Sequence, residues 1–156
     1  MWLRWIETSS LAVTIRDSPW IYPSLEILHI VGFVVLVGAA MMFDVRLLGM
    51  SCDLAVDRMA THLLRWSRAS VLLVVPSGLL LFMSAATETW ANPAFRIKLI
   101  LIACAGLNAY VFHRWPFRTV SEWNYDRPPA GARVAAVASL VLWTGVIAAG
   151  RMIAYW

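Results

Sequence analysis

The sequence predicts an all-α integral membrane protein: an antiparallel four-helix bundle preceded by an interfacial amphipathic segment. Of the 156 residues, 61% are hydrophobic and only 14% are charged, a balance that lies outside the range of soluble domains. Four separate segments each offer the roughly 20 mostly apolar residues that a membrane-spanning helix requires. Consecutive spans joined by loops of this size pack as antiparallel neighbours.

The N-terminal segment, residues 1–20, mixes tryptophans with charged side chains. Trp2, Trp5 and Trp20 alternate with charged residues such as Arg4, and the segment lacks the continuous apolar core of a signal peptide. Tryptophan and charge together are typical of the lipid headgroup region. We therefore expect residues 1–20 to lie at the membrane surface and residues 21–156 to form the bundle.

Proline, asparagine and serine mark the ends and faces of the spans. We expect the four spans at about residues 23–48, 61–86, 93–114 and 132–155. Pro23 is expected in the first turn of the first span, and Asn92 followed by proline predicts the N-terminus of the third span. Pro76 predicts a kink in the second span. Small residues recur every seven positions on that span, at Ser70, Ser77 and Ser84. Such a face lets membrane helices approach closely.

The basic residues predict the orientation. Four spans place both termini and the 87–92 loop on one side, which we call side A, and the 49–60 and 115–131 loops on side B. The basic residues of side B are Arg46, Arg58, Arg65, Arg68, Arg114, Arg118, Arg127 and Arg133, against Arg4, Arg16, Arg96, Lys98 and Arg151 on side A. The positive-inside rule then places side B in the cytoplasm and both termini in the periplasm of a bacterial inner membrane. Because these residues flank apolar runs, the net charge of +4 does not indicate nucleic-acid binding.

Polar residues from several spans are expected to meet near side A. His29 lies roughly 9 Å beyond the Pro23 boundary and Lys98 roughly 8 Å beyond Pro93 at 1.5 Å per residue, so the two share a depth. Glu26 lies on the His29 face of its helix. The other candidates at this end are Arg96, Met83 and Met152. Ionisable groups inside a membrane span indicate a functional role or a polar partner within the protein.

A structural role for the same residues stays open. Lys98 and Arg96 can extend to the headgroups, Glu26 can neutralise Lys98, and His29 can donate to a backbone carbonyl. On side B, His62 and His113 form an alternative bis-histidine haem pair. Asp44 and Arg46 are interpreted as boundary charges that pair with Arg65 or Arg68.

Five segments resemble an uncharacterised family of small bacterial four-helix inner-membrane proteins. They are residues 28–32 (LHIVG), 44–49 (DVRLLG), 78–82 (GLLLF), 92–98 (NPAFRIK) and 106–113 (GLNAYVFH). This resemblance covers nearly the whole chain and implies no particular activity. His29 in an early span and Lys98 near the start of a later one also resemble the copper-resistance D membrane domain and the J-type protoporphyrinogen oxidase. The second likeness implies b-type haem and redox chemistry at His29 and Lys98.

These observations predict a b-haem-binding redox or electron-transfer subunit in contact with the lipid bilayer. His29 would be the axial ligand, Lys98 or Arg96 would pair with a propionate, and Met83 or Met152 would supply a sixth ligand. The alternatives are a non-catalytic accessory subunit of a larger membrane complex and a copper-handling protein that uses His29 and the side-A methionines. Other membrane subunits or a periplasmic redox partner are the expected partners. The common hydrolase, nucleotide and zinc-protease motifs are absent, and whether the protein is an enzyme stays open.

Overall fold

The computed structural model describes residues 2–155 and shows an all-α chain. In order, its helices are α1 (Trp2–Glu7), α2 (Ser10–Asp17), α3 (Ile21–Leu47), α4 (Val56–Ser84), α5 (Ala86–Ala91), α6 (Pro93–Arg114), η1 (Pro116–Glu122), α7 (Ala130–Met152) and η2 (Ile153–Tyr155). No strand occurs within these residues. The predicted fold class is confirmed.

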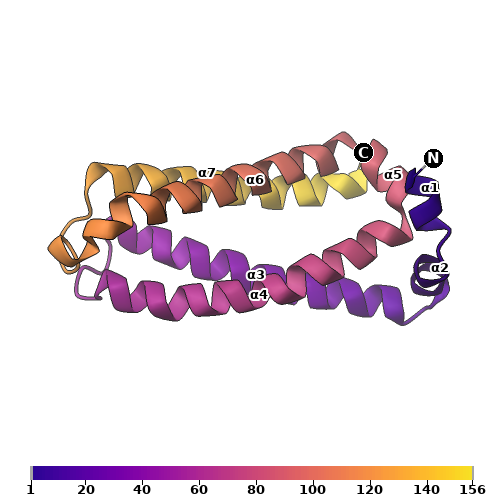
Figure 1. Cartoon of the computed structure of the whole chain (residues 1–156), viewed down its shortest axis with the longest axis horizontal. Helices are drawn as coiled ribbons and strands as arrows, with labels where there is room; N and C mark the ends of the chain where they lie inside the picture. Colours follow the sequence, from indigo (N-terminus) through magenta and orange to yellow (C-terminus); the bar gives the residue numbers. More distant parts are fainter. Residues whose placement is uncertain (1, 156) are drawn as a thin grey trace.

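The four long helices form two antiparallel hairpins that lie side by side. α3 packs against α4, α6 packs against α7, and α3 and α7 join the two hairpins. Figure 1 shows the short helices α1, α2 and α5 grouped at one end with both chain termini, which is side A. The α3–α4 and α6–α7 loops lie at the other end, side B.

The helix bounds agree with the expected spans except on side B of α4. Its helix begins at Val56, five residues before the expected boundary, and includes the charged residues Asp57 and Arg58 in its first turn. The expected boundary followed the apolar residues, whereas a helix can continue into the headgroup region with polar residues. α6 matches its expected bounds because Asn92 caps it, with its Oδ1 accepting from the Ala94 N–H at 2.9 Å.

The long helices present large apolar side chains outward. All four are long and apolar enough to cross a membrane. Leu72 is 75% exposed, Val34 63% and Ile100 62%. Exposing so many large apolar side chains to water would be unfavourable for a soluble helical bundle. The protein is therefore a multi-pass membrane protein whose helix surfaces contact lipid.

The apolar core is concentrated toward side B. Its buried members are Phe43, Leu47, Val56, Ala60, Phe112, Trp123, Ala132 and Ala136. Beside them, Arg46 is only 1% exposed. Its guanidinium donates to the Leu54 carbonyl at 2.8 Å and to the Asn124 carbonyl at 3.1 Å, so it ties the two side-B loops together.

The interpretation of Asp44 and Arg46 as boundary charges paired with Arg65 or Arg68 is wrong. Both Asp44 and Arg46 are buried. Within residues 2–155 the only ion pair joins Arg16 to Asp17. Arg46 satisfies its donors with carbonyl oxygens of the loops, which the sequence pattern did not reveal.

The serine face of α4 is confirmed as a contact face. Ser70, Ser77 and Ser84 are each at most 3% exposed, and each hydroxyl donates to a carbonyl of its own helix. Across from them, a Cβ added at Gly32 of α3 would lie 2.9 Å from a methyl carbon of Val74. The two helices therefore approach closely. Figure 1 shows α4 changing direction along its length, and Pro76, the proline inside this helix, is expected to bend it.

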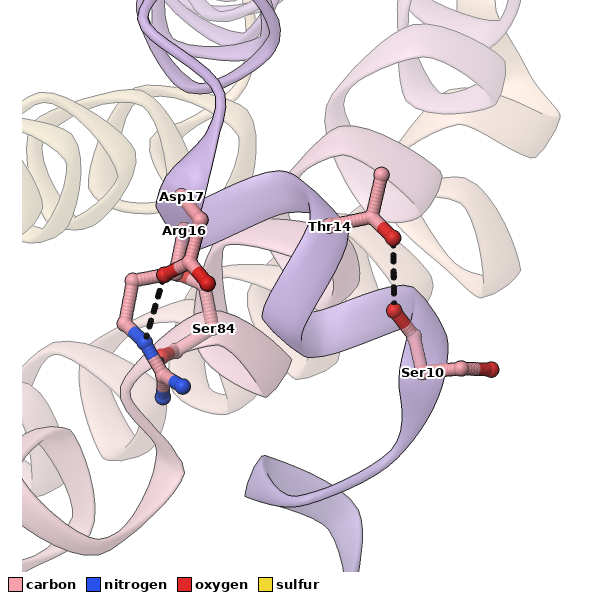
Figure 2. Close-up of polar contacts among 5 residues, drawn as sticks. All are labelled: Ser10, Thr14, Arg16, Asp17 and Ser84. Carbon is pink, nitrogen blue, oxygen red and sulfur yellow. Dashed lines mark hydrogen bonds and ion pairs between the residues drawn. The ribbon is translucent and has the colours of Figure 1, made fainter.

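Residues 2–17 form two short helices that pack on the side-A end of the hairpins. The Ser9 hydroxyl caps α2 by accepting from the Ala12 N–H at 3.3 Å. Figure 2 shows Arg16 of α2 beside Asp17 and near the last turn of α4, where it donates to the Ser84 carbonyl at 3.5 Å. The interfacial location of this segment stays a prediction.

Candidate functional site

His29 of α3 is fixed by hydrogen bonds to the neighbouring helix α4. Its Nδ1 lies 3.0 Å from the Val74 carbonyl oxygen and 3.0 Å from the Ser77 hydroxyl oxygen. The Ser77 hydroxyl gives its proton to the Leu73 carbonyl, so toward His29 it acts as an acceptor. With two acceptors facing it, Nδ1 carries the ring proton of neutral His29. The Nε2 atom therefore holds a free lone pair.

Gly78 provides the space that the His29 ring occupies. A Cβ added at Gly78 would lie 2.9 Å from Cε1 of His29 and 3.3 Å from its Nδ1. Real Cβ contacts are essentially never shorter than 3.0 Å. The half-buried imidazole thus fits a notch in α4 that only glycine leaves open.

Lys98 of α6 lies along α7 in a similar way. Its Nζ is 3.7 Å from the position of a Cβ at Gly150, and its Cδ and Cε are 3.8 Å from it. The side chain is half-buried. His29 and Lys98 thus both lie in the side-A halves of their helices, α3 and α6, and that they share one pocket stays a prediction.

Three of the four remaining side-A candidates are more exposed than His29 and Lys98. Glu26, Arg96 and Met152 are exposed, whereas Met83 is half-buried. Within the described chain no ion pair joins Glu26 to Lys98, so the suggested neutralisation of Lys98 by Glu26 does not take the form of a direct contact. That Glu26, Arg96, Met83 and Met152 hold a ligand stays a prediction.

Sequence reasoning missed the residues that position His29. Ser77 was recognised only as part of a small face, Gly78 only as the first residue of the 78–82 segment, and Gly150 was not considered. The signal available in the sequence was the pair of small residues, Ser77 and Gly78, that directly follows Pro76.

Two aromatic pairs also join the helices of this region. Phe82 of α4 stacks on Phe95 of α6 with ring centroids 5.4 Å apart, and Phe33 of α3 meets Trp143 of α7 edge to face at 6.2 Å.

On side B, His62 and His113 are both exposed. His113 Nδ1 donates to the Ala109 carbonyl of its own helix at 2.8 Å, and its ring lies 5.3 Å from that of Phe117. His62 lines a surface depression with Asp57, Arg58, Thr61 and Arg65. Among residues 2–155 no group of three or more His, Cys, Asp or Glu side chains is arranged to hold a metal ion. The bis-histidine pair stays a prediction.

Comparison with known proteins identifies a family but no characterised relative. No curated protein and no solved structure matches the chain. One family model, described as "Family of unknown function (DUF6644)", matches residues 2–156. The expectation of an uncharacterised family is confirmed. Because the match spans nearly the whole sequence, the chain belongs to this family of unknown function.

Proposed function

We propose that this protein is a b-haem-binding redox or electron-transfer subunit of the bacterial inner membrane, with His29 as an axial ligand. The observation that supports this is the free Nε2 of an imidazole whose Nδ1 is fixed by Val74 and Ser77. Histidines that ligate metals usually donate their other ring N–H to a carbonyl or carboxylate, which sets the tautomer and orients the ring. His29 meets this condition inside a membrane-spanning helix.

Lys98 fits the role of a charge partner for the cofactor. A haem carries propionate groups, and the half-buried Lys98, which lies in the side-A half of α6 as His29 lies in the side-A half of α3, would offer them a compensating charge. Arg96, which is exposed and lies two residues before Lys98 in α6, would be a second partner for a propionate. Met83 or Met152 would supply the sixth ligand, since thioethers serve as axial ligands in electron-transfer haems.

When bound, the haem would supply one-electron chemistry. This chain's own part is to hold the group through His29, to balance its charge through Lys98, and to keep the site within the membrane. The resemblance of His29 and Lys98 to the J-type protoporphyrinogen oxidase supports the same assignment. With side A in the periplasm, the electron-transfer partner would be periplasmic or another membrane subunit.

The test is a visible spectrum of protein purified from membranes made with ample haem supply. We expect a Soret band that His29→Ala loses while the variant still inserts into the membrane. His62→Ala and His113→Ala are matched controls that should keep the band, since His62 lies near the side-B start of α4 and His113 near the side-B end of α6. A band that survives His29→Ala but is lost in both side-B variants would move the haem to side B.

A spectrum without a chromophore would overturn the haem proposal. The accessory-subunit alternative would then gain, and one observation favours it: Trp5 and Trp20 are 78% and 80% exposed at the side-A end, where a partner subunit can cover them. Copper analysis of the same sample separates the third alternative. Bound copper that depends on His29 and Met83 would support copper handling.

A further inference from the structure

Asp44 is a carboxylic side chain buried inside the membrane-spanning part of α3. It is 6% exposed and adjoins Phe43 of the apolar core. Its Oδ2 is the only buried side-chain nitrogen or oxygen in residues 2–155 that lacks a hydrogen-bond partner. The hydroxyl of Ser139 on α7 is the polar group near the carboxyl. Native proteins rarely leave such an atom unsatisfied, so this one requires an explanation.

Among residues 2–155, no charged side chain forms an ion pair with Asp44. Its helix neighbour Arg46 is occupied by the carbonyl oxygens of Leu54 and Asn124. The titratable or charged residues at the side-B ends of the helices packed against α3 are Asp57, Arg58, His62, Arg65 and Arg68 of α4 and Arg133 of α7; all are exposed. In the described part of the chain none forms an ion pair with Asp44.

An isolated carboxylate in an apolar, water-free surrounding is strongly disfavoured, and such a group takes up a proton instead. The neutral acid keeps one carbonyl oxygen and one O–H, which an adjacent hydroxyl can satisfy. Ionisable residues inside membrane helices that have no counter-ion often serve as proton sites. We propose that Asp44 is a proton-binding site within the membrane, where its carboxyl is held as the neutral acid beside Ser139 of α7.

This site is separate from the His29 region. The inference does not rest on the proposed haem, since Asp44 lies near the side-B end of α3 and His29 near its side-A end. We propose a proton and not a metal ion as the ligand. A metal site would need further ligand side chains beside Asp44, and the described residues contain no group of three or more His, Cys, Asp or Glu side chains that could hold a metal ion.

Labelling with dicyclohexylcarbodiimide tests the proposal on the full chain in lipid vesicles at neutral pH. This apolar reagent reacts with protonated carboxyls inside membranes: the acid proton moves to a carbodiimide nitrogen and the carboxylate oxygen adds to the central carbon. Mass spectrometry should find the adduct on the peptide that contains Asp44. Asp44→Asn should lose it, and Asp53→Asn, which changes an exposed loop residue, should keep it.

Infrared spectroscopy of the same vesicles decides the outcome where the reagent fails to reach the site. The wild-type spectrum should contain the carbonyl stretch of a protonated carboxylic acid that moves in D2O and is absent from Asp44→Asn. Ser139→Ala retains Asp44 and should shift this band by removing the neighbouring hydroxyl. Spectra of wild type and Ser139→Ala that show only ionised carboxylates at neutral pH would overturn the proposal, whatever the labelling shows.

Discussion

The imidazole of His29 occupies the space that a side chain at Gly78 of the neighbouring helix would need. A Cβ at position 78 would lie 2.9 Å from His29 Cε1, and the ring cannot turn away freely because Val74 and Ser77 hold its Nδ1. This contact decides which residues of α4 a ligand of His29 would meet. It also makes Gly78 the most sensitive position of the site.

Gly78→Ala should therefore displace His29. The added methyl group forces either the ring or the helix pair to shift, which we expect to destabilise the protein by about 1–3 kcal/mol as overpacking does. Thermal unfolding in detergent measures the loss, and any haem should be lost with it. Gly38→Ala is the matched control, since a Cβ at Gly38 meets nothing within 4 Å. Equal stability of the two variants would contradict the contact.

Ser77→Ala should change the environment of the His29 ring without removing it. The variant loses one of the two acceptors of Nδ1, and we expect a destabilisation of roughly 1 kcal/mol, typical of one hydrogen bond. The ¹⁵N chemical shift of His29 Nδ1 reports the change directly. Ser70→Ala also removes a buried hydroxyl that donates to its own helix, but in this control variant the chemical shift of His29 Nδ1 should match wild type. A shared shift would assign the effect to α4 as a whole.

The long helices were predictable because each span follows from a local count of apolar residues. The start of α6 was fixed by Asn92 and Pro93, whose capping chemistry acts within a few residues. The serine face of α4 was likewise visible as a seven-residue period. These features depend on neighbours in sequence, which the chain itself displays.

The contacts of the site were not predictable in the same way. That His29 meets Ser77 and Gly78 depends on how α3 and α4 rotate about their axes and how closely Gly32 lets them approach. The burial of Arg46 depends on two loops that converge from distant parts of the chain. A pattern within one helix specifies which face is small or polar, but not which residue of another helix faces it.

Arg46→Gln should destabilise the side-B end more than any exposed arginine variant. The shorter neutral side chain removes the Arg46 donor of the Leu54 carbonyl and one donor of the Asn124 carbonyl, which also accepts from the Val56 N–H at 3.2 Å. A buried group that is left unsatisfied costs about 1–3 kcal/mol. Thermal unfolding and proteolysis of the 49–55 loop measure the effect. Arg68→Gln, which changes an exposed side chain, should stay within about 0.5 kcal/mol of wild type. A loop that remains protected in Arg46→Gln would contradict this role.

The excess of arginine on side B predicts that this side lies in the cytoplasm. Reporter fusions at Asp53 and Asp126 should show a cytoplasmic location, and a fusion after residue 156 a periplasmic one. Alkaline phosphatase and fluorescent-protein reporters give opposite signals on the two sides and so control each other. The reverse pattern would place the His29 region near the cytoplasm and exclude a periplasmic electron-transfer partner.

The contact between α1 and α5 should depend on pH through Glu7. The Thr87 hydroxyl and backbone N–H both donate to the Glu7 carboxylate, and these hydrogen bonds hold the pKa of Glu7 below its ordinary value of 4.5. Because the folded-state pKa is lowered, the contact is at full strength above 4.5 and is lost as the pH falls through the lowered value. Hydrogen exchange at the Thr87 amide, corrected for its intrinsic pH dependence, should therefore accelerate in that acidic range. In Glu7→Gln the Thr87 amide should exchange faster already at neutral pH, and the acid dependence should be lost. Glu88→Gln is the control and should behave as wild type, because Glu88 does not take part in this contact. Protection of the Thr87 amide that does not change with pH in wild type would contradict the role of Glu7.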